Sequence, residues 1–174
     1  MLDNLGSPPD SIELADRLAI LDILAGHSRG LDRLDLDLLR AVYWEDAQVD
    51  YGFFKGLAHE FAGLVVGALS GGYELTQHVL GNSLVDLDGD VARVETLVTA
   101  WHLEPGAERE MMSTGRYLDK LEKRAGTWKL SHRLVLIDWV RRYDITNERE
   151  DEQFDALGKG RHDREDPSYI HFSS

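Results

Sequence analysis

Cysteine is absent from this chain of 174 residues. The absence excludes disulfide bonds, thiolate nucleophiles and zinc sites built from cysteine ligands. Basic residues are also few, since 19 Lys and Arg stand against 32 Asp and Glu and give a formal net charge of -13. Binding to phosphate backbones or anionic lipids needs a clustered basic surface. We therefore expect neither a nucleic-acid partner nor a membrane partner.

Long apolar runs are missing as well, so we expect no membrane-spanning helix. The N-terminal stretch MLDNLGSPPDSIE is polar and acidic, whereas a secretory signal begins with a basic segment followed by an apolar one. These features predict a cytoplasmic protein. The length suits one domain over residues 1–174, with a core at about 11–143. The charged tail, 144–174, is predicted either to form a helix that ends near Gly158 and then a loose arm, or to be largely disordered.

Helical signals fill the first part of the chain. Asp10 is placed to cap a helix over residues 11–30, where apolar residues recur at helical spacing. Asp35 is placed to cap a second helix over residues 36–43. Residues 57–70 predict a third helix.

The pattern changes to strands after residue 72. Alternating apolar residues predict four long strands, at residues 75–86, 91–103, 109–123 and 127–143. Residues 47–51 predict a short extended segment. Turn signals between the long strands, such as Asp88-Gly89, fit hairpins. Helices followed by an antiparallel meander indicate an α+β fold with the helices packed on one face of a curved sheet.

Three of the predicted strands each place one titratable or cationic side chain among apolar neighbours: His78, His102 and Arg133. Because strand side chains alternate between faces, His78 is expected to share a face with Leu84. Buried charges need partners, and Asp32 at the end of the first helix is the natural counter-charge. Taken singly, each has a structural explanation, since strand histidines are usually hydrogen-bonded core residues and Asp favours turns and caps.

Three segments together resemble a known family: GLDRLDLDLLRAVYWEDAQVDYG, TQHVLGN and GRYLDKLEKRAGTWKLSHRLVLIDW. They are similar to the SnoaL-like branch of the nuclear-transport-factor-two-like superfamily, which includes scytalone dehydratase, lindane dehydrochlorinase and bacterial bile-acid 7α-dehydratases. The resemblance covers roughly residues 11–143. It implies a cone-shaped, strongly curved antiparallel sheet packed on N-terminal helices, a cystatin-type roll with a deep cavity. It also implies a homo-oligomer, a dimer or trimer, for which Trp101 or Trp128 on an exposed sheet face could supply the interface.

The resemblance also implies which residues carry activity. In the lyases of this family an aspartate at the end of the first helix and a histidine on the first long strand form a catalytic dyad, and Asp32 and His78 match them. Arg133 matches an arginine on the last strand of lindane dehydrochlorinase. His102 falls within one residue of the second histidine of scytalone dehydratase, and His27 takes the position of a tyrosine in the bile-acid enzymes.

Two more residues are candidates for substrate contact. Tyr117 falls near an asparagine of scytalone dehydratase, and Tyr51 ends the short extended segment. Leu31 replaces the tyrosine that precedes the aspartate in scytalone dehydratase. The resemblance therefore keeps the dyad but changes the groups that handle the substrate oxygen, and it does not carry over scytalone as substrate.

The chemistry that these residues imply is proton abstraction by a histidine base that an aspartate orients. It calls for no metal, flavin or nicotinamide cofactor, and the sequence has no glycine-rich nucleotide motif. We expect a cofactor-independent lyase of the dehydratase type, acting on a small apolar ring compound such as an aromatic, polyketide or steroid-like molecule. The alternatives are release of formaldehyde from an arylpropane diol, isomerisation of a steroid-like ketone, and non-catalytic binding of a small ligand.

Overall fold

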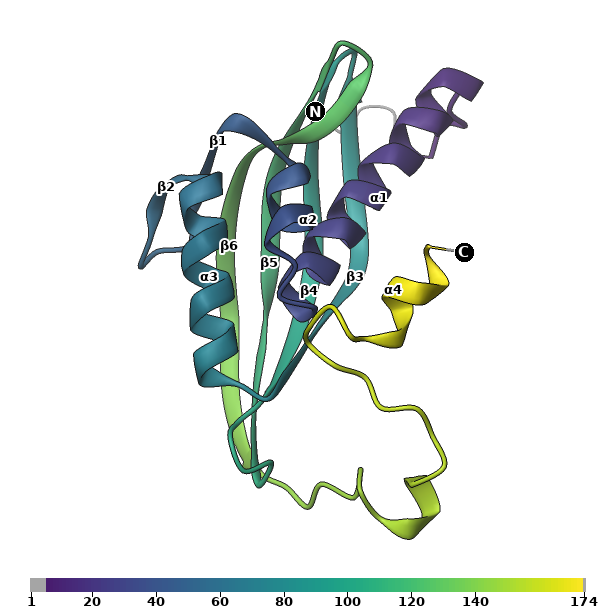
Figure 1. Ribbon diagram of the computed structural model, residues 1–174. Coiled ribbons are helices and arrows are strands. Elements are labelled where there is room, and N and C mark those ends of the chain that lie inside the picture. The colour runs from purple at the N-terminus through teal and green to yellow at the C-terminus, as the bar shows by residue number, and fades with distance from the viewer. Residues whose placement is uncertain (1–5, 174) are drawn as a thin grey trace.

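A curved six-stranded sheet with helices on one face makes up the computed structural model, which describes residues 6–173 (Figure 1). The helices are α1 (Ser11–Asp32), α2 (Leu36–Ala41), α3 (Ala58–Gly72) and α4 (Pro167–His171), with a 3-10 turn at Glu152–Phe154. The strands are β1 (Tyr43–Asp50), β2 (Lys55–Leu57), β3 (Leu75–Asp88), β4 (Val91–Leu103), β5 (Arg109–Arg124) and β6 (Thr127–Asp144). Within residues 6–173, no helix has both the length and the apolar character needed to cross a membrane.

The strand order is β2-β1-β6-β5-β4-β3, and every pairing is antiparallel except that of β1 with β6. The four long strands lie where the sequence predicts them, within a few residues. Gly89, Gly106 and Gly126 in the turns between them have positive φ angles, which glycine adopts without strain. The predicted α+β fold is thus confirmed. β3 forms one edge of the sheet, and α1 packs beside it.

The first helices end at other residues than the sequence predicts. α1 runs past Gly30 to Asp32, because Gly30 serves packing instead of ending the helix. A side chain at Gly30 would come within 3.2 Å of the backbone nitrogen of Leu39 on α2. α2 ends early, at Ala41, because Tyr43 already belongs to β1.

A β-bulge divides β3. Leu80 and Ser83 are three residues apart, but their partners on β4 are only two apart, so β3 carries one extra residue. The bulge reverses the alternation, and Leu84 is 40% exposed on the face opposite to His78. The prediction that these two share a face is therefore wrong. After the bulge it is Val85 that packs against the core.

The core lies between the helices and the concave face of the sheet. Trp128 is 4% exposed and its indole N–H donates to the carboxylate of Asp16 on α1 at 2.9 Å. The expectation that Trp128 lies on an exposed sheet face is therefore wrong. Trp101 lies on the other face of the sheet, because its neighbour His102 points into the core.

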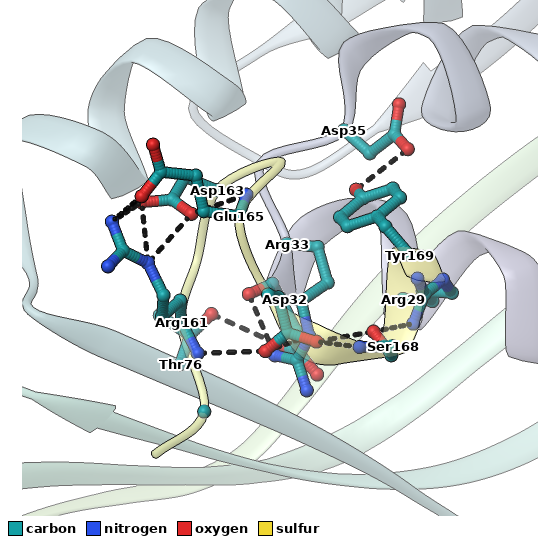
Figure 2. Close-up of polar contacts among 12 residues, drawn as sticks. Arg29, Asp32, Arg33, Asp35, Thr76, Arg161, Asp163, Glu165, Ser168 and Tyr169 are labelled. Atoms are coloured by element: carbon teal, nitrogen blue, oxygen red, sulfur yellow. Dashed lines mark hydrogen bonds and ion pairs between the residues drawn. The ribbon is translucent and has the colours of Figure 1, made fainter. Parts of the chain in front are cut away.

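The C-terminal arm, residues 145–173, returns from the end of β6 to the C-terminal end of α1 (Figure 1). It contains only the 3-10 turn and α4, so the predicted helix ending near Gly158 is wrong. Arg29 of α1 donates to the Ser168 hydroxyl at 3.0 Å, and the Tyr169 hydroxyl donates to Asp35 at 2.9 Å (Figure 2). The arm therefore docks onto the helix end that carries Asp32.

Candidate active site

Asp32, the last residue of α1, accepts three hydrogen bonds from β3. Its carboxylate lies 2.7 Å from Nδ1 of His78, 2.8 Å from the backbone nitrogen of His78 and 2.9 Å from the Thr76 hydroxyl. Figure 2 shows the contact with Thr76. Asp32 is 8% exposed, so these bonds are formed largely out of water. The structure thus brings Asp32 and His78 together as the sequence predicts.

The contact fixes the tautomer of His78. An ionised carboxylate only accepts hydrogen bonds, so Nδ1 must carry the proton of the neutral ring and Nε2 must carry the lone pair. Nε2 has no hydrogen-bond partner among residues 6–173. His78 therefore presents a free basic nitrogen while its other nitrogen is held in place.

His102 lies next to this pair. Its ring centre is 5.5 Å from that of His78, with the two planes nearly perpendicular, and 4.7 Å from the ring centre of Tyr73. Burial, followed by the nearby His78, lowers the pKa of His102 to about 4. His102 is therefore a neutral imidazole at physiological pH.

Arg133 belongs to a second polar group, inside the core. Its guanidinium is fully buried and binds both carboxylate oxygens of Asp119, each at 2.7 Å. It also donates to Nδ1 of His27 at 2.7 Å and lies 4.0 Å from the ring centre of Tyr117. The counter-charge of Arg133 is thus Asp119, which corrects the expectation that Asp32 fills this role.

Burial keeps the tyrosines and the histidine around Arg133 uncharged. It raises the pKa values of the Tyr117 and Tyr51 phenols above their ordinary range. Burial, then the positive charge of Arg133 and then the nearby His78, lowers the pKa of His27. Since a guanidinium can only donate, His27 is neutral with its proton on Nε2.

The dyad opens onto a cavity of about 880 Å³ between the edge of the sheet and the C-terminal arm. Asp32 and His78 line one part of it, Trp101 another, and Phe154 and Leu157 line it from the side of the arm. The other predicted site residues are not part of its wall: His27, Tyr51, His102, Tyr117 and Arg133. The predicted residues thus form two groups, a dyad at the cavity and a buried set within the core.

The arm is anchored beside the dyad by Asp166. This carboxylate is 4% exposed, accepts the backbone N–H of Arg161 at 2.8 Å and lies 3.5 Å from the guanidinium of Arg33. Burial raises its pKa, but the Ser168 hydroxyl, the backbone N–H groups and Arg33 outweigh burial and lower it to about 2. The arm therefore engages the residue directly after Asp32.

Sequence reasoning missed Asp119 and Thr76. Asp119 follows Tyr117 by two residues and is paired across the sheet with Arg133, so strict alternation along β5 would have placed it on the inner face. Thr76 precedes His78 by two residues and shares its face for the same reason. No group of three or more metal-binding side chains occurs in the described part of the chain.

Residues 12–134 match the family model of the SnoaL-like domain. Rv2910c of Mycobacterium tuberculosis and Mb2934c of Mycobacterium bovis, both described as uncharacterized, are 26% identical to this chain over 125 residues. Each match covers 70% of this chain and 85% of the relative.

Solved structures with a similar fold include three from bacteria. The hexachlorocyclohexane dehydrochlorinase LinA-type3 of Novosphingobium barchaimii has a TM-score of 0.72 and 20% identity, over 80% of this chain and 99% of that one. A candidate scytalone dehydratase of Novosphingobium aromaticivorans has a TM-score of 0.69 and 23% identity, over 77% of this chain and 91% of that one. A protein of Nostoc punctiforme with a cystatin-like fold has a TM-score of 0.62 and 19% identity, over 71% of this chain and 92% of that one. The cystatin-like fold expected from the sequence is thus confirmed.

Proposed function

The chain belongs to the SnoaL-like domain family, and we propose that it is a lyase in which His78, oriented by Asp32, removes a proton from a small, apolar, ring-containing substrate. The supporting observation is that Nε2 of His78 is free beside a cavity while Nδ1 is held by a carboxylate. The proposed reaction is an elimination of the dehydratase type. It needs no redox cofactor, because the substrate as a whole is neither oxidised nor reduced.

In the proposed step, Nε2 of His78 accepts a proton from a carbon of the substrate. The electrons of the C–H bond form a double bond as the neighbouring C–O bond breaks. The imidazolium that results lies 2.7 Å from the carboxylate of Asp32, which stabilises its charge. General base catalysis of this kind typically contributes about 10²–10⁴-fold.

His102 lies beside the base but outside the cavity wall, so in the proposal it acts on His78 and does not contact the departing oxygen. As a neutral imidazole it carries one N–H, and its ring lies 5.5 Å from that of His78. An uncharged neighbour of this kind leaves the imidazolium that forms on His78 without a repelling charge. The departing hydroxyl takes up the proton that Nε2 of His78 has accepted and leaves as water, which returns His78 to its basic form.

Arg133 enters the proposal as a positioning residue. Its guanidinium is fully buried and divided between Asp119 and His27, so it holds those side chains and Tyr117 in place. His27 lies close enough to His78 for the protonation of one ring to disfavour that of the other. The buried group therefore sets the rigidity and the polarity of the core directly behind the dyad. In the proposal it does not contact the leaving group.

The test compares wild type with His78→Gln on a panel of hydroxylated aromatic, lignin-derived and steroid-like compounds, with products followed by mass spectrometry. Loss of water from the substrate identifies a dehydratase, loss of formaldehyde a C–C lyase, and an isomer of unchanged mass an isomerase. His78→Gln should be folded and inactive, while His132→Gln, which changes an exposed histidine, should keep full activity. Binding of panel compounds without turnover by the wild type would instead indicate a ligand-binding module.

A further inference from the structure

The cavity at the dyad bends around the edge strand β3. Side chains along a strand point alternately to its two faces, so His78 points to the concave face while Gln77 and Val79 point to the outer face. All three nevertheless line the same cavity. The cavity therefore continues from the dyad, past the open edge of the sheet, onto the outer face.

The outer part of the cavity has a mostly apolar floor, which consists of Leu75, Gln77 and Val79 of β3 and Trp101 and Leu103 of β4. Glu110 of β5 marks its far side. Neighbouring strands are about 4.8 Å apart, so this floor extends roughly 10 Å from the edge of the sheet toward β5.

The C-terminal arm forms an apolar roof over this floor. Ile145, Phe154 and Leu157 line the cavity from the arm side. Leu157 is 63% exposed and Phe154 37% exposed, although both belong to the cavity wall. Apolar side chains on both sides of an open space gain free energy when an apolar ligand fills it.

The cations of the arm are already engaged by the arm itself. Lys159 donates to the backbone carbonyl oxygens of Arg149 and Phe154 at 2.5 and 2.8 Å. Arg149 donates to the carbonyl oxygen of Gly160 at 2.9 Å and pairs with Glu150 at 3.2 Å. An anionic group of a ligand would have to displace these contacts, and a charged group of either sign would lose its hydration against the apolar side chains of the floor and roof. The outer part of the cavity therefore favours an uncharged occupant.

We propose that the substrate is an elongated, uncharged amphipathic molecule whose reacting end lies at Asp32 and His78 and whose apolar chain or second ring extends around β3 onto the Trp101 floor, beneath Leu157. The inference rests on the proposed function, and it names the class of molecule that this function acts on. A single ring would occupy only a part of about 880 Å³, a volume near the upper end of ordinary small-molecule sites. A ring at the dyad also cannot reach the floor on the other side of the strand.

The test measures binding without requiring turnover. A series of para-alkylphenols, from methyl to octyl, is titrated into the full-length protein by calorimetry. In the wild type each methylene that reaches the floor should tighten binding roughly fourfold. In Leu157→Asp this gain should shrink, while the affinity for para-methylphenol stays unchanged. Ile170→Asp is the matched control, because Ile170 is a 76% exposed apolar residue of the same arm that does not line the cavity.

The proposal would be overturned if the affinity of the wild type did not change with the length of the alkyl chain. It would also be overturned if Ile170→Asp and Leu157→Asp lost the same share of the gain in affinity per methylene. The same flat dependence would follow if a second copy of the chain covered the floor, and sedimentation would then show a larger species. His78→Gln should keep the chain-length dependence, because binding needs no proton transfer. A clear dependence without turnover of any substrate would reject the proposed function alone, and turnover with a flat dependence would reject the elongated substrate alone.

Discussion

His78 is bound to the carboxylate of Asp32 at two points, through its ring nitrogen at 2.7 Å and through its own backbone N–H at 2.8 Å. One carboxylate thus holds both the ring and the backbone of His78 in place. Because β3 is an edge strand, this backbone N–H would otherwise be open to pairing with another chain. Asp32 therefore orients the proposed base and at the same time occupies a donor on the sheet edge.

Replacing Asp32 with Asn should lower turnover by about 10²–10⁴-fold, because a neutral amide can present its N–H₂ to His78 and no longer stabilises the imidazolium. Stability should fall by about 1.5–3 kcal/mol, the usual value for hydrogen bonds to a charged group. Urea unfolding and turnover assays measure the two effects. Thr76→Val removes only the third donor to the carboxylate and serves as control, with a stability loss of about 1 kcal/mol. Equal turnover in Asp32→Asn and wild type would contradict the dyad.

Replacing Arg133 with Met should destabilise the protein by about 3–5 kcal/mol, because the Asp119 carboxylate would remain buried without its partner. The double variant Arg133→Met with Asp119→Leu should recover much of this loss, since it removes both charges. Equilibrium denaturation of the two single variants and the double variant gives the coupling energy. Additive losses in the double variant would show that the pair is not energetically linked.

Stability should fall as the pH drops below 6.5. His102 binds a proton near pH 6.5 when unfolded but only near pH 4 when folded, so the unfolded chain takes up more protons in this window. The free energy of unfolding is unaffected by the protonation of His102 above about pH 6.5, and it is lower by about 3 kcal/mol at pH 4. The lowered pKa of His27 acts in the same direction. Denaturation of wild type and His102→Gln across this range checks the effect, because the variant should show a shallower dependence on pH.

Replacing Asp166 with Ala should release the C-terminal arm without unfolding the sheet. The change removes the N-cap of α4 and the contact with Arg33. Trypsin should then cleave faster after Arg149 and Lys159, which lie in the arm. Asp163→Ala is the control, because Asp163 is only half-buried and pairs with Arg161 within the arm. Unchanged cleavage in Asp166→Ala would mean that other contacts hold the arm.

The sequence predicts the order of elements well because the four long strands alternate over many residues between clear turn signals. β4 begins and ends at the predicted residues, 91 and 103. The helix ends are less predictable, because they depend on contacts made after folding. Gly30 resembles a helix end in the sequence, but its role is set by the backbone of Leu39 on another helix.

The candidate site is predictable where the order of the elements already brings two residues together. Asp32 and His78 are such a pair, because the end of α1 packs beside β3. The site is not predictable where side-chain pairing decides, as with Arg133 and Asp119, since two carboxylates compete for one guanidinium and only the cross-strand register chooses between them. The arm is the least predictable part. Its docking depends on single contacts, such as that of Tyr169 with Asp35, which have no periodicity in the sequence.

The bulge at Leu80–Ser83 divides β3 into two parts whose inward-facing residues differ in parity. Before it, even-numbered residues face inward and include Thr76 and His78; after it, odd-numbered residues such as Val85 do so. Deleting the one extra residue would restore a continuous parity and turn either the base or the core residues toward solvent. The number of residues between His78 and Val85 is therefore set by the packing on both sides of the bulge, and it constrains this segment separately from the chemistry of its side chains.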